Sequence, residues 1–230
     1  MKAGNGLSPI IKEIMDISAY LWSKGWAEAN GGNISVDVTD MFDGTSKMKF
    51  SPKASTAFKK GSYPSLKNRL FLISGSGCRF RDIAENPGNG ICLIHLSDDG
   101  SMFNIIDSDE SSSDIRPTSE LPTHLLLHEY MRSTGMKERV VLHTHPTELT
   151  AISHIRRFWD ENVFNRLLHG MLPEVRSSIL KARDWSIISC PALRNWLNPH
   201  WQKSALGSGL SSGRNMAAWQ YPTALQAHLT

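Results

Sequence analysis

The first regular hydrophobic pattern in the chain spans residues 8–26. Apolar side chains recur there at a spacing near 3.6, as in one face of a helix. They are Ile10, Ile11, Ile14, Met15, Ile17, Leu21 and Trp22. Ser8 supplies a cap and Pro9 a first-turn proline, so a helix is predicted to start here.

Short apolar or alternating runs predict strands at residues 34–38, 70–73, 91–96 and 102–106, with a further strand from Val140 to Thr144. Residues 39–69 read as a basic loop, and 107–114 as an exposed acidic loop. Helical patterns cover residues 119–134, where Ser119 can cap, then 148–159 and 161–176. Strand and helix signals that alternate through residue 160 predict an α/β fold without fixing the strand order.

Composition narrows the class of protein. A chain of 230 residues can bury a substantial core, as one large domain or two small ones. We expect no membrane span and no secretory signal, hence a cytoplasmic protein. The formal charge of +3 does not suggest a nucleic-acid partner. Cys78, Cys92 and Cys190 are widely spaced, which fits reduced thiols.

The strongest chemical signal is His143-Thr144-His145 at the end of an apolar strand closed by Pro146. On a strand the i, i+2 spacing places both imidazoles on one face. Two such nitrogens form half of a divalent-metal site, and zinc is the usual ion at nitrogen-rich sites. The alternative is a pair of histidines that serves only packing.

Residues 119–134 hold further candidates. Glu120 lies a helix length upstream of the two histidines and strengthens the prediction of a metal site, although in the first turn it can merely complement the helix dipole. His124 and His128 are spaced i, i+4 and can bind a metal as a pair, although His128 is better placed for the outer face.

Two glycine-rich turns follow or precede predicted strands. Residues 30–33 read Asn-Gly-Gly-Asn before one strand, and residues 74–77 read Ser-Gly-Ser-Gly after another. Such turns can present backbone N–H groups to a phosphate. Each can also be a plain turn.

These motifs together resemble the class II aldolase/adducin family. The shared stretches are residues 30–33, residues 74–77, the run 118–124 (Thr-Ser-Glu-Leu-Pro-Thr-His) and the His-Thr-His at 143–145, in the order and spacing of the family. The similarity covers residues 8–176. It implies a three-layer α/β fold in which helices flank a mainly antiparallel central sheet.

The resemblance also implies roles for individual residues. His143 and His145 would ligate Zn²⁺, and Glu120 would move a proton on the dihydroxyacetone-phosphate carbon. The phosphate would be bound by Asn30, Asn33, Ser76, Gly77 and Ser119. Glu174 would reach the active site of a neighbouring subunit in a homotetramer.

Within the family the most similar branch cleaves L-rhamnulose 1-phosphate to dihydroxyacetone phosphate and L-lactaldehyde, in L-rhamnose catabolism. The Trp22 to Trp26 stretch and the long insertion at 39–69 favour that substrate. The alternatives are another class II sugar-phosphate aldolase or epimerase, and a non-catalytic adducin-like module. Glu120, His143 and His145 argue against the non-catalytic module, which has no need of them.

The sequence departs from the family after Arg176, so we expect an incomplete aldolase domain at 1–176 and an aberrant tail at 177–230. The family's third metal histidine, in a His-Gly motif after a β-branched strand, does not follow. The tail instead holds four of the seven tryptophans and a single acid, Asp184.

The tail can be a divergent domain or a flexible segment, but its tryptophan content does not suit a solvated tail, and we expect a frameshift instead. Reading each codon one base earlier lets Ser208–Ala218 encode Arg-Val-Val-Val-Trp-Glu-Glu-His-Gly-Cys. In that string Asn215 followed by Met216 allows only His or Tyr, and the glycine after it is forced. Ser177–Asp184 then permits Phe-Phe-His-Pro-Glu-Gly-Ser-Gly. We hypothesise that one base was lost near the codons for Arg176 and Ser177, which leaves the zinc site without its third histidine and this chain weakly active or inactive.

Overall fold

The computed structural model describes residues 7–42, 52–58, 61–106 and 115–160, together with 163, 166–167, 170 and 218–220. The chain divides into two compact units, Met1–His145 with Trp219–Thr230, and Pro146–Ala218. The predicted loop at 107–114 and most of the predicted helix at 161–176 lie outside the described residues.

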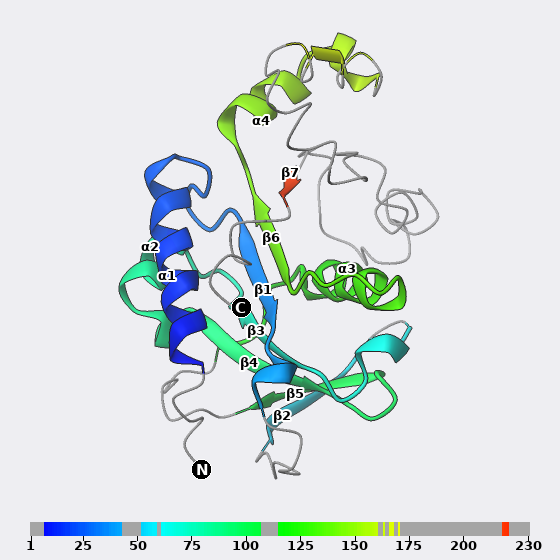
Figure 1. Ribbon diagram of the computed structural model, residues 1–230. Helices are drawn as coiled ribbons and strands as arrows, with labels where there is room; N and C mark the ends of the chain where they lie inside the picture. Colours follow the sequence, from blue (N-terminus) through cyan, green and yellow to red (C-terminus); the bar gives the residue numbers. More distant parts are fainter. Residues whose placement is uncertain are drawn as a thin grey trace. The chain divides into compact units, whose positions relative to one another are not determined.

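The first unit is built on an antiparallel sheet (Figure 1). Its strands lie in the order β2-β5-β4-β3-β1-β6-β7. Their bounds are β1 Asn33–Asp37, β2 Pro52–Ala57, β3 Leu70–Ser74, β4 Ile91–Leu96, β5 Met102–Ile106, β6 Val140–Thr144 and β7 Ala218–Gln220. The pairings among β1 to β6 are all antiparallel.

Helices cover both faces of this sheet. They are α1 Ser8–Ser23, α2 Phe80–Glu85 and α3 Leu121–Ser133, and short 3₁₀ turns lie at Thr39–Met41, Pro64–Leu66 and Pro87–Asn89. In the second unit, α4 spans Thr147–Ser153 and a 3₁₀ turn spans Arg156–Trp159. The α/β fold with a mainly antiparallel central sheet is therefore confirmed.

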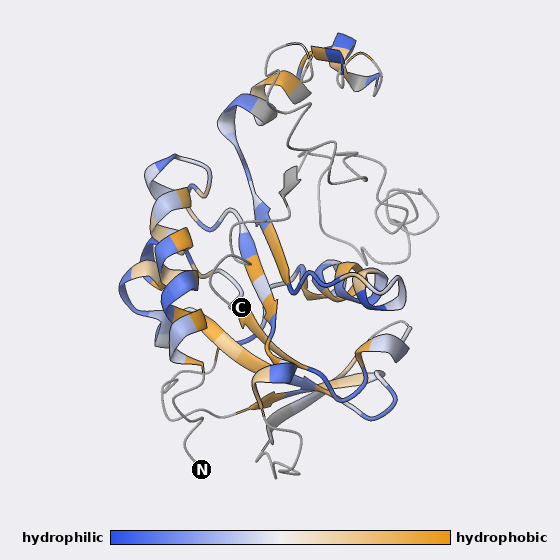
Figure 2. Cartoon of the chain, in the orientation of Figure 1, coloured by the Kyte–Doolittle hydropathy of each residue, from blue (hydrophilic) through white to orange (hydrophobic). Residues whose placement is uncertain are grey.

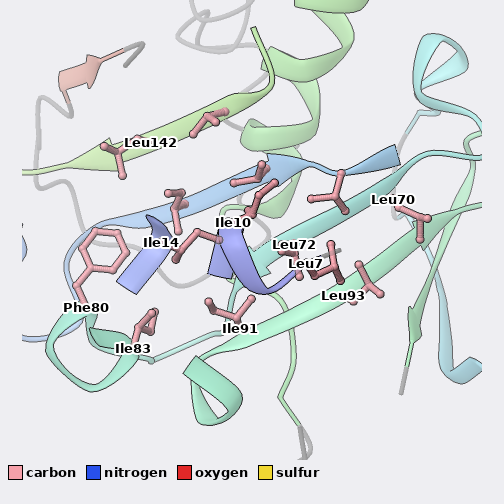
Figure 3. Close-up of a cluster of buried hydrophobic side chains, with 14 of the residues drawn as sticks. Leu7, Ile10, Ile14, Leu70, Leu72, Phe80, Ile83, Ile91, Leu93 and Leu142 are labelled. Atoms are coloured by element: carbon pink, nitrogen blue, oxygen red, sulfur yellow. The ribbon is translucent and has the colours of Figure 1, made fainter. Parts of the chain in front are cut away.

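Period-two alternation divides the core into two layers. Figure 3 shows one layer, in which Ile10 and Ile14 of α1 meet Leu72 and Leu142 of the sheet, with Phe80 of α2 beside them. Residues of the opposite parity, such as Phe71 and Ile73, pack with Leu121 and Leu125 of α3. Figure 2 shows the apolar residues concentrated on the strands.

Three local predictions were wrong. Pro52–Ala57 forms strand β2 rather than loop, because it pairs with β5 through its backbone and its Pro-Lys-Ala-Ser-Thr-Ala sequence lacks large apolar residues that would announce a strand. Ser119 does not cap α3, whose cap position is Glu120. Ser8 is already inside α1 and makes no capping hydrogen bond, although Pro9 does lie in the first turn.

Candidate functional site: an imidazole–carboxylate cluster at one edge of the sheet

Three strand ends meet at the same edge of the sheet. Strand β1 begins at Asn33, which pairs with His143 near the end of β6. Strand β3 ends on the other side of β1, where Ser74 Oγ accepts a hydrogen bond of 3.1 Å from the Ile34 N–H. Antiparallel pairing therefore gathers residues that are far apart in sequence.

The glycine-serine turn after β3 lies beside the segment that leads into α3. Gly75 and Pro117 form an isolated antiparallel bridge. The Ser76 N–H donates to the Arg116 carbonyl at 2.8 Å, and the Thr118 N–H to the Ser74 carbonyl at 2.9 Å. These bonds place the turn at 75–77 beside residues 116–118, the segment that leads to Glu120.

The predicted phosphate-binding residues differ in exposure. Asn30, Ser76, Gly77 and Ser119 are exposed at turns, where a ligand can reach them. Asn33 is buried at the first residue of β1. The structure brings Ser76 and Gly77 near the segment that holds Ser119, and Asn33 near His143. Their role in binding phosphate stays a prediction.

His143 and His145 converge, as the i, i+2 spacing predicts. Their Nε2 atoms are 3.0 Å apart, and their ring centroids 4.7 Å apart. The His145 N–H donates to the Trp26 carbonyl at 2.8 Å, and Thr144 Oγ1 donates to the same carbonyl at 2.6 Å. The loop after α1 therefore holds the end of β6 in place.

Glu120 completes the cluster. Its Oε2 lies 2.7 Å from His143 Nδ1, and its side chain is 40% exposed while that of His143 is only 5% exposed. Burial works to raise the pKa of Glu120, but hydrogen bonds from His143 and Asn33 and the nearby imidazoles outweigh burial and lower it. Glu120 is thus an ionised, reachable carboxylate, which suits a proton acceptor.

The donor set fits one side of a zinc site. Two nitrogens bound to one tetrahedral zinc ion are about 3.3 Å apart, close to the observed separation of the two Nε2 atoms. A His143 Nδ1–H donated to Glu120 leaves Nε2 as the ligand atom, an arrangement that orients metal-binding histidines. Within the described part of the chain, no group of three or more His, Cys, Asp or Glu residues could hold a metal ion.

The glycines of the Asn-Gly-Gly-Asn turn lie against the two histidines. A Cβ on Gly31 would lie 3.1 Å from His145 Nδ1, and one on Gly32 would lie 2.9 Å from the His143 carbonyl oxygen. Gly32 also has a φ of +85°, a conformation that side chains disfavour. The turn is therefore a close backbone contact with the cluster as well as an entry into β1.

His124 and His128 do not face outward or form a metal pair. Both are fully buried, and both contact Ser35 Oγ, at 2.7 Å from His124 Nδ1 and 2.8 Å from His128 Nε2. Burial is the main cause that lowers the pKa of each to about 3, so both are neutral. The expectation that His128 lies on the outer face was wrong.

Sequence reasoning missed Ser35. The sequence does indicate that Ser35 faces away from the apolar core layer, because Ser35 and Asp37 are the polar positions in the alternating run that forms β1. They point away from the apolar layer that contains Ile34 and Val36, toward α3. Glu174, predicted to act in a neighbouring subunit, lies outside the described residues.

Comparison with known proteins decides the family. The family described as "Class II Aldolase and Adducin N-terminal domain" matches residues 12–185. The chain belongs to this family. The resemblance inferred from the motifs at 30–33, 74–77, 118–124 and 143–145 is thereby confirmed.

Curated relatives carry a more specific name. The chain is 35% identical to a rhamnulose-1-phosphate aldolase of Bacteroides thetaiotaomicron over 171 residues, which is 74% of this chain and 62% of that protein. It is 34% identical to the rhamnulose-1-phosphate aldolase of Listeria welshimeri over 177 residues, 73% of this chain and 59% of that protein. The chain thus spans about three fifths of the length of these relatives.

A solved structure agrees with the fold. The crystal structure of a sugar-phosphate aldolase from Thermotoga maritima is similar to this chain with a TM-score of 0.57 and 28% identity. The similarity covers 74% of this chain and 66% of that one.

In the described part of this chain, no helix is long and apolar enough to cross a membrane.

Proposed function

We propose that the imidazole–carboxylate cluster belongs to a zinc-dependent aldolase that cleaves L-rhamnulose 1-phosphate into dihydroxyacetone phosphate and L-lactaldehyde. The observation that carries the proposal is the 2.7 Å contact between Glu120 and His143, beside the 3.0 Å approach of His143 and His145. The names of the curated relatives favour this substrate over other sugar phosphates.

In cleavage, the bond between C3 and C4 of the ketose breaks, and its electron pair stays on C3. The C4 hydroxyl loses its proton and becomes the aldehyde, while C3 gains a proton and becomes the hydroxymethyl carbon of dihydroxyacetone phosphate. The proton of the C4 hydroxyl leaves to solvent, and Glu120, after taking up one proton from solvent, is the group proposed to deliver it to C3, or to remove it in the reverse direction. Its partial exposure lets the substrate reach it, while His143 and Asn33 hold it.

His143 and His145 would hold the zinc ion through their Nε2 atoms. When bound, zinc supplies electrophilic stabilisation of the negative charge that develops on the substrate oxygens. The exposed turns at Asn30, at Ser76–Gly77 and at Ser119 would take the phosphate group through N–H and hydroxyl donors.

The remaining partners are part of the same proposal. Glu174 would enter the active site of a neighbouring subunit, and the assembly would be a homotetramer. The substrate is a phosphorylated intermediate of L-rhamnose catabolism, and the cytoplasm is the proposed location.

We further propose that residues 177–230 are read out of frame. The shifted reading of Asn215–Ala217 restores a His-Gly, which supplies a third zinc ligand. Loss of one protein ligand removes most of the affinity of a three-ligand site. The present chain is therefore expected to bind zinc weakly, and a chain restored to frame after Arg176 is expected to bind it tightly. Sequencing the gene across the Arg176–Ser177 junction checks the frame directly.

The experiment that tests the function compares both chains, loaded with zinc, for release of dihydroxyacetone phosphate from L-rhamnulose 1-phosphate. L-fuculose 1-phosphate, followed in the same way, and L-ribulose 5-phosphate, followed by its epimerisation at C4, serve as competing substrates. Cleavage of the first sugar in preference to the other two, by the restored chain, is the expected result. Preference for either competitor transfers the assignment to another class II enzyme, and no cleavage of any sugar by the zinc-loaded restored chain contradicts an aldolase.

A further inference from the structure

A buried polar chain runs behind the candidate site, between β1 and α3. Ser35 Oγ lies 2.7 Å from His124 Nδ1 and 2.8 Å from His128 Nε2. All three residues are at most 1% exposed. On its other side His124 Nε2 contacts Asn33 Oδ1, and Asn33 in turn makes a side-chain hydrogen bond to Glu120. The chain thus ends on the carboxylate of the site.

The orientation of the Asn33 amide fixes the direction of every hydrogen bond in this polar network. Its Oδ1 contacts His124 Nε2, so its Nδ2–H is the group left to donate to Glu120. The Oδ1 atom only accepts, so His124 must carry its proton on Nε2 and present a bare Nδ1 to Ser35.

The hydrogen bonds at the far end of this polar network, at Ser35 and His128, are fixed in the same way. Because His124 Nδ1 accepts, the Ser35 hydroxyl donates its single proton to it. The Ser35 oxygen is then left as an acceptor for His128, which must also be protonated on Nε2. Each group has one orientation that satisfies both neighbours, and reversing any one of them places two donors or two acceptors face to face.

A merely structural layer does not need such groups. Buried polar groups contribute little net stability even when all are satisfied, whereas the apolar side chains Leu121 and Leu125 pack α3 against the sheet without that constraint. What a fully satisfied network adds is one defined arrangement of the group at its end.

We propose that Ser35, His124 and His128 are positioning residues that hold the Asn33 amide with its N–H toward Glu120. Asn33 then fixes the carboxylate from one side as His143 does from the other. The assignment of this role rests on the proposed function, in which Glu120 moves the proton.

The first test reads the tautomers in the full chain as it exists. Long-range ¹H–¹⁵N correlation spectra of the ¹⁵N-histidine-labelled protein at neutral pH identify which ring nitrogen carries the proton. The signals are assigned from the His124→Gln and His128→Gln variants. Both histidines are expected as neutral Nε2–H tautomers. An Nδ1–H tautomer or a protonated ring at either position overturns the proposal.

The second test asks whether the chain controls Asn33. Ser35→Ala removes the central hydroxyl and is expected to speed solvent exchange of the Asn33 side-chain amide protons by about tenfold, the loss of roughly one hydrogen bond. Ser18→Ala is the matched control, because Ser18 is equally buried but lies on α1. Equal exchange in Ser35→Ala and in the unaltered chain contradicts a positioning role.

Neither readout needs substrate or zinc. The protein can show both NMR signatures while its frame-restored form cleaves no sugar phosphate. That result contradicts the proposed function but is consistent with the hydrogen-bond network that orients Asn33. If the frame-restored protein cleaves a sugar phosphate but the NMR signatures are absent, the proposed function stands and the positioning role of Ser35, His124 and His128 is contradicted.

Discussion

Asn33 on β1 is the direct antiparallel partner of His143 on β6. This pairing places the first residue of β1 beside a histidine of β6 that lies far along the sequence. Because side chains alternate along a strand, a slip of one residue in this register would turn His143 away from α3 and Glu120. The site therefore depends on backbone pairing as much as on the residues themselves.

Removing the carboxylate of Glu120 is predicted to weaken zinc binding. Glu120→Ala deletes the acceptor that lies 2.7 Å from His143 Nδ1, and loss of such an orienting partner lowers metal affinity by about 10–100-fold. Competition with a chromophoric chelator measures the affinity.

Glu85→Ala is the matched control, since Glu85 is an exposed carboxylate at the end of α2. Equal zinc affinities of Glu120→Ala and Glu85→Ala would show that Glu120 has no part in orienting His143.

A side chain at Gly32 is predicted to destabilise the site and the fold. A Cβ there combines a φ of +85° with a 2.9 Å approach to the His143 carbonyl. Gly135→Ala is the comparison, because Gly135 has a φ of +74° but nothing within 4 Å of its Cβ.

We expect Gly135→Ala to lower the free energy of unfolding by about 1–2 kcal/mol from backbone strain alone, and Gly32→Ala to lower it by more. Urea denaturation measures both. Equal losses of stability in the two variants would show that the close approach of a Cβ at Gly32 to the His143 carbonyl has no steric cost.

The buried ion pair at the other end of β1 is predicted to contribute strongly to stability. Asp37 Oδ2 lies 2.6 Å from Arg69 Nε, and the Asp37 side chain is only 3% exposed. Asp37→Ala leaves Arg69, whose side chain is 17% exposed, with its longer contact of 3.5 Å to Asp40. The loss of stability is therefore expected to stay at or below the about 3–5 kcal/mol that breaking a fully buried pair costs.

Asp16→Ala breaks an exposed pair with Lys12 at 2.9 Å and is expected to change stability by less than about 1 kcal/mol. Thermal or urea unfolding of the two variants makes the comparison. A similar small loss in both would contradict a structural role for Asp37.

Stability is predicted to fall in mild acid because of His128. Burial, together with the nearby Arg69, lowers the pKa of His128 from 6.5 to about 3. Between these values the unfolded chain binds a proton that the folded chain does not. The free energy of unfolding therefore decreases as pH falls below about 6.5, by up to about 1.4 kcal/mol per pH unit for this group.

His128→Gln removes that contribution, so its stability should depend less steeply on pH than that of the unaltered chain. Urea titrations at several pH values between about 4 and 7 measure the slopes. His154→Gln, at an exposed position, should retain the steeper slope. An unchanged slope in His128→Gln counts against a neutral, buried imidazole.

The sequence predicts the fold where periodicity and burial agree. Leu70 to Ile73 and Ile91 to Leu96 are apolar on both faces, and both are central strands packed between helical layers. Strand β2 was missed because its side chains are small or polar and give no hydrophobic pattern. Backbone pairing with β5 at the edge of the sheet holds it in the strand conformation. Strand order also stayed open, since antiparallel pairing between segments distant in sequence leaves no local signal.

The sequence predicted which motifs form the site. It did not predict the contacts that surround them. The i, i+2 spacing of His143 and His145 indicates a shared face, which the structure confirms through their 3.0 Å approach. The burial of His128 was not predictable from helical spacing, because it depends on Ser35, a polar residue on a strand that the helix covers. Tertiary hydrogen bonding decided that position.

The most direct measurement of the central claim is exchange of the hydroxymethyl proton of dihydroxyacetone phosphate in D₂O, followed by ¹H NMR with the zinc-loaded, frame-restored chain. Exchange isolates the proton transfer assigned to Glu120 and needs no aldehyde. We predict rapid exchange that falls by at least about 100-fold in Glu120→Gln and is unaffected by the exposed control Glu85→Gln. Absence of exchange with zinc bound, or equal exchange in Glu120→Gln, would contradict the assignment of Glu120 as the base of a class II aldolase.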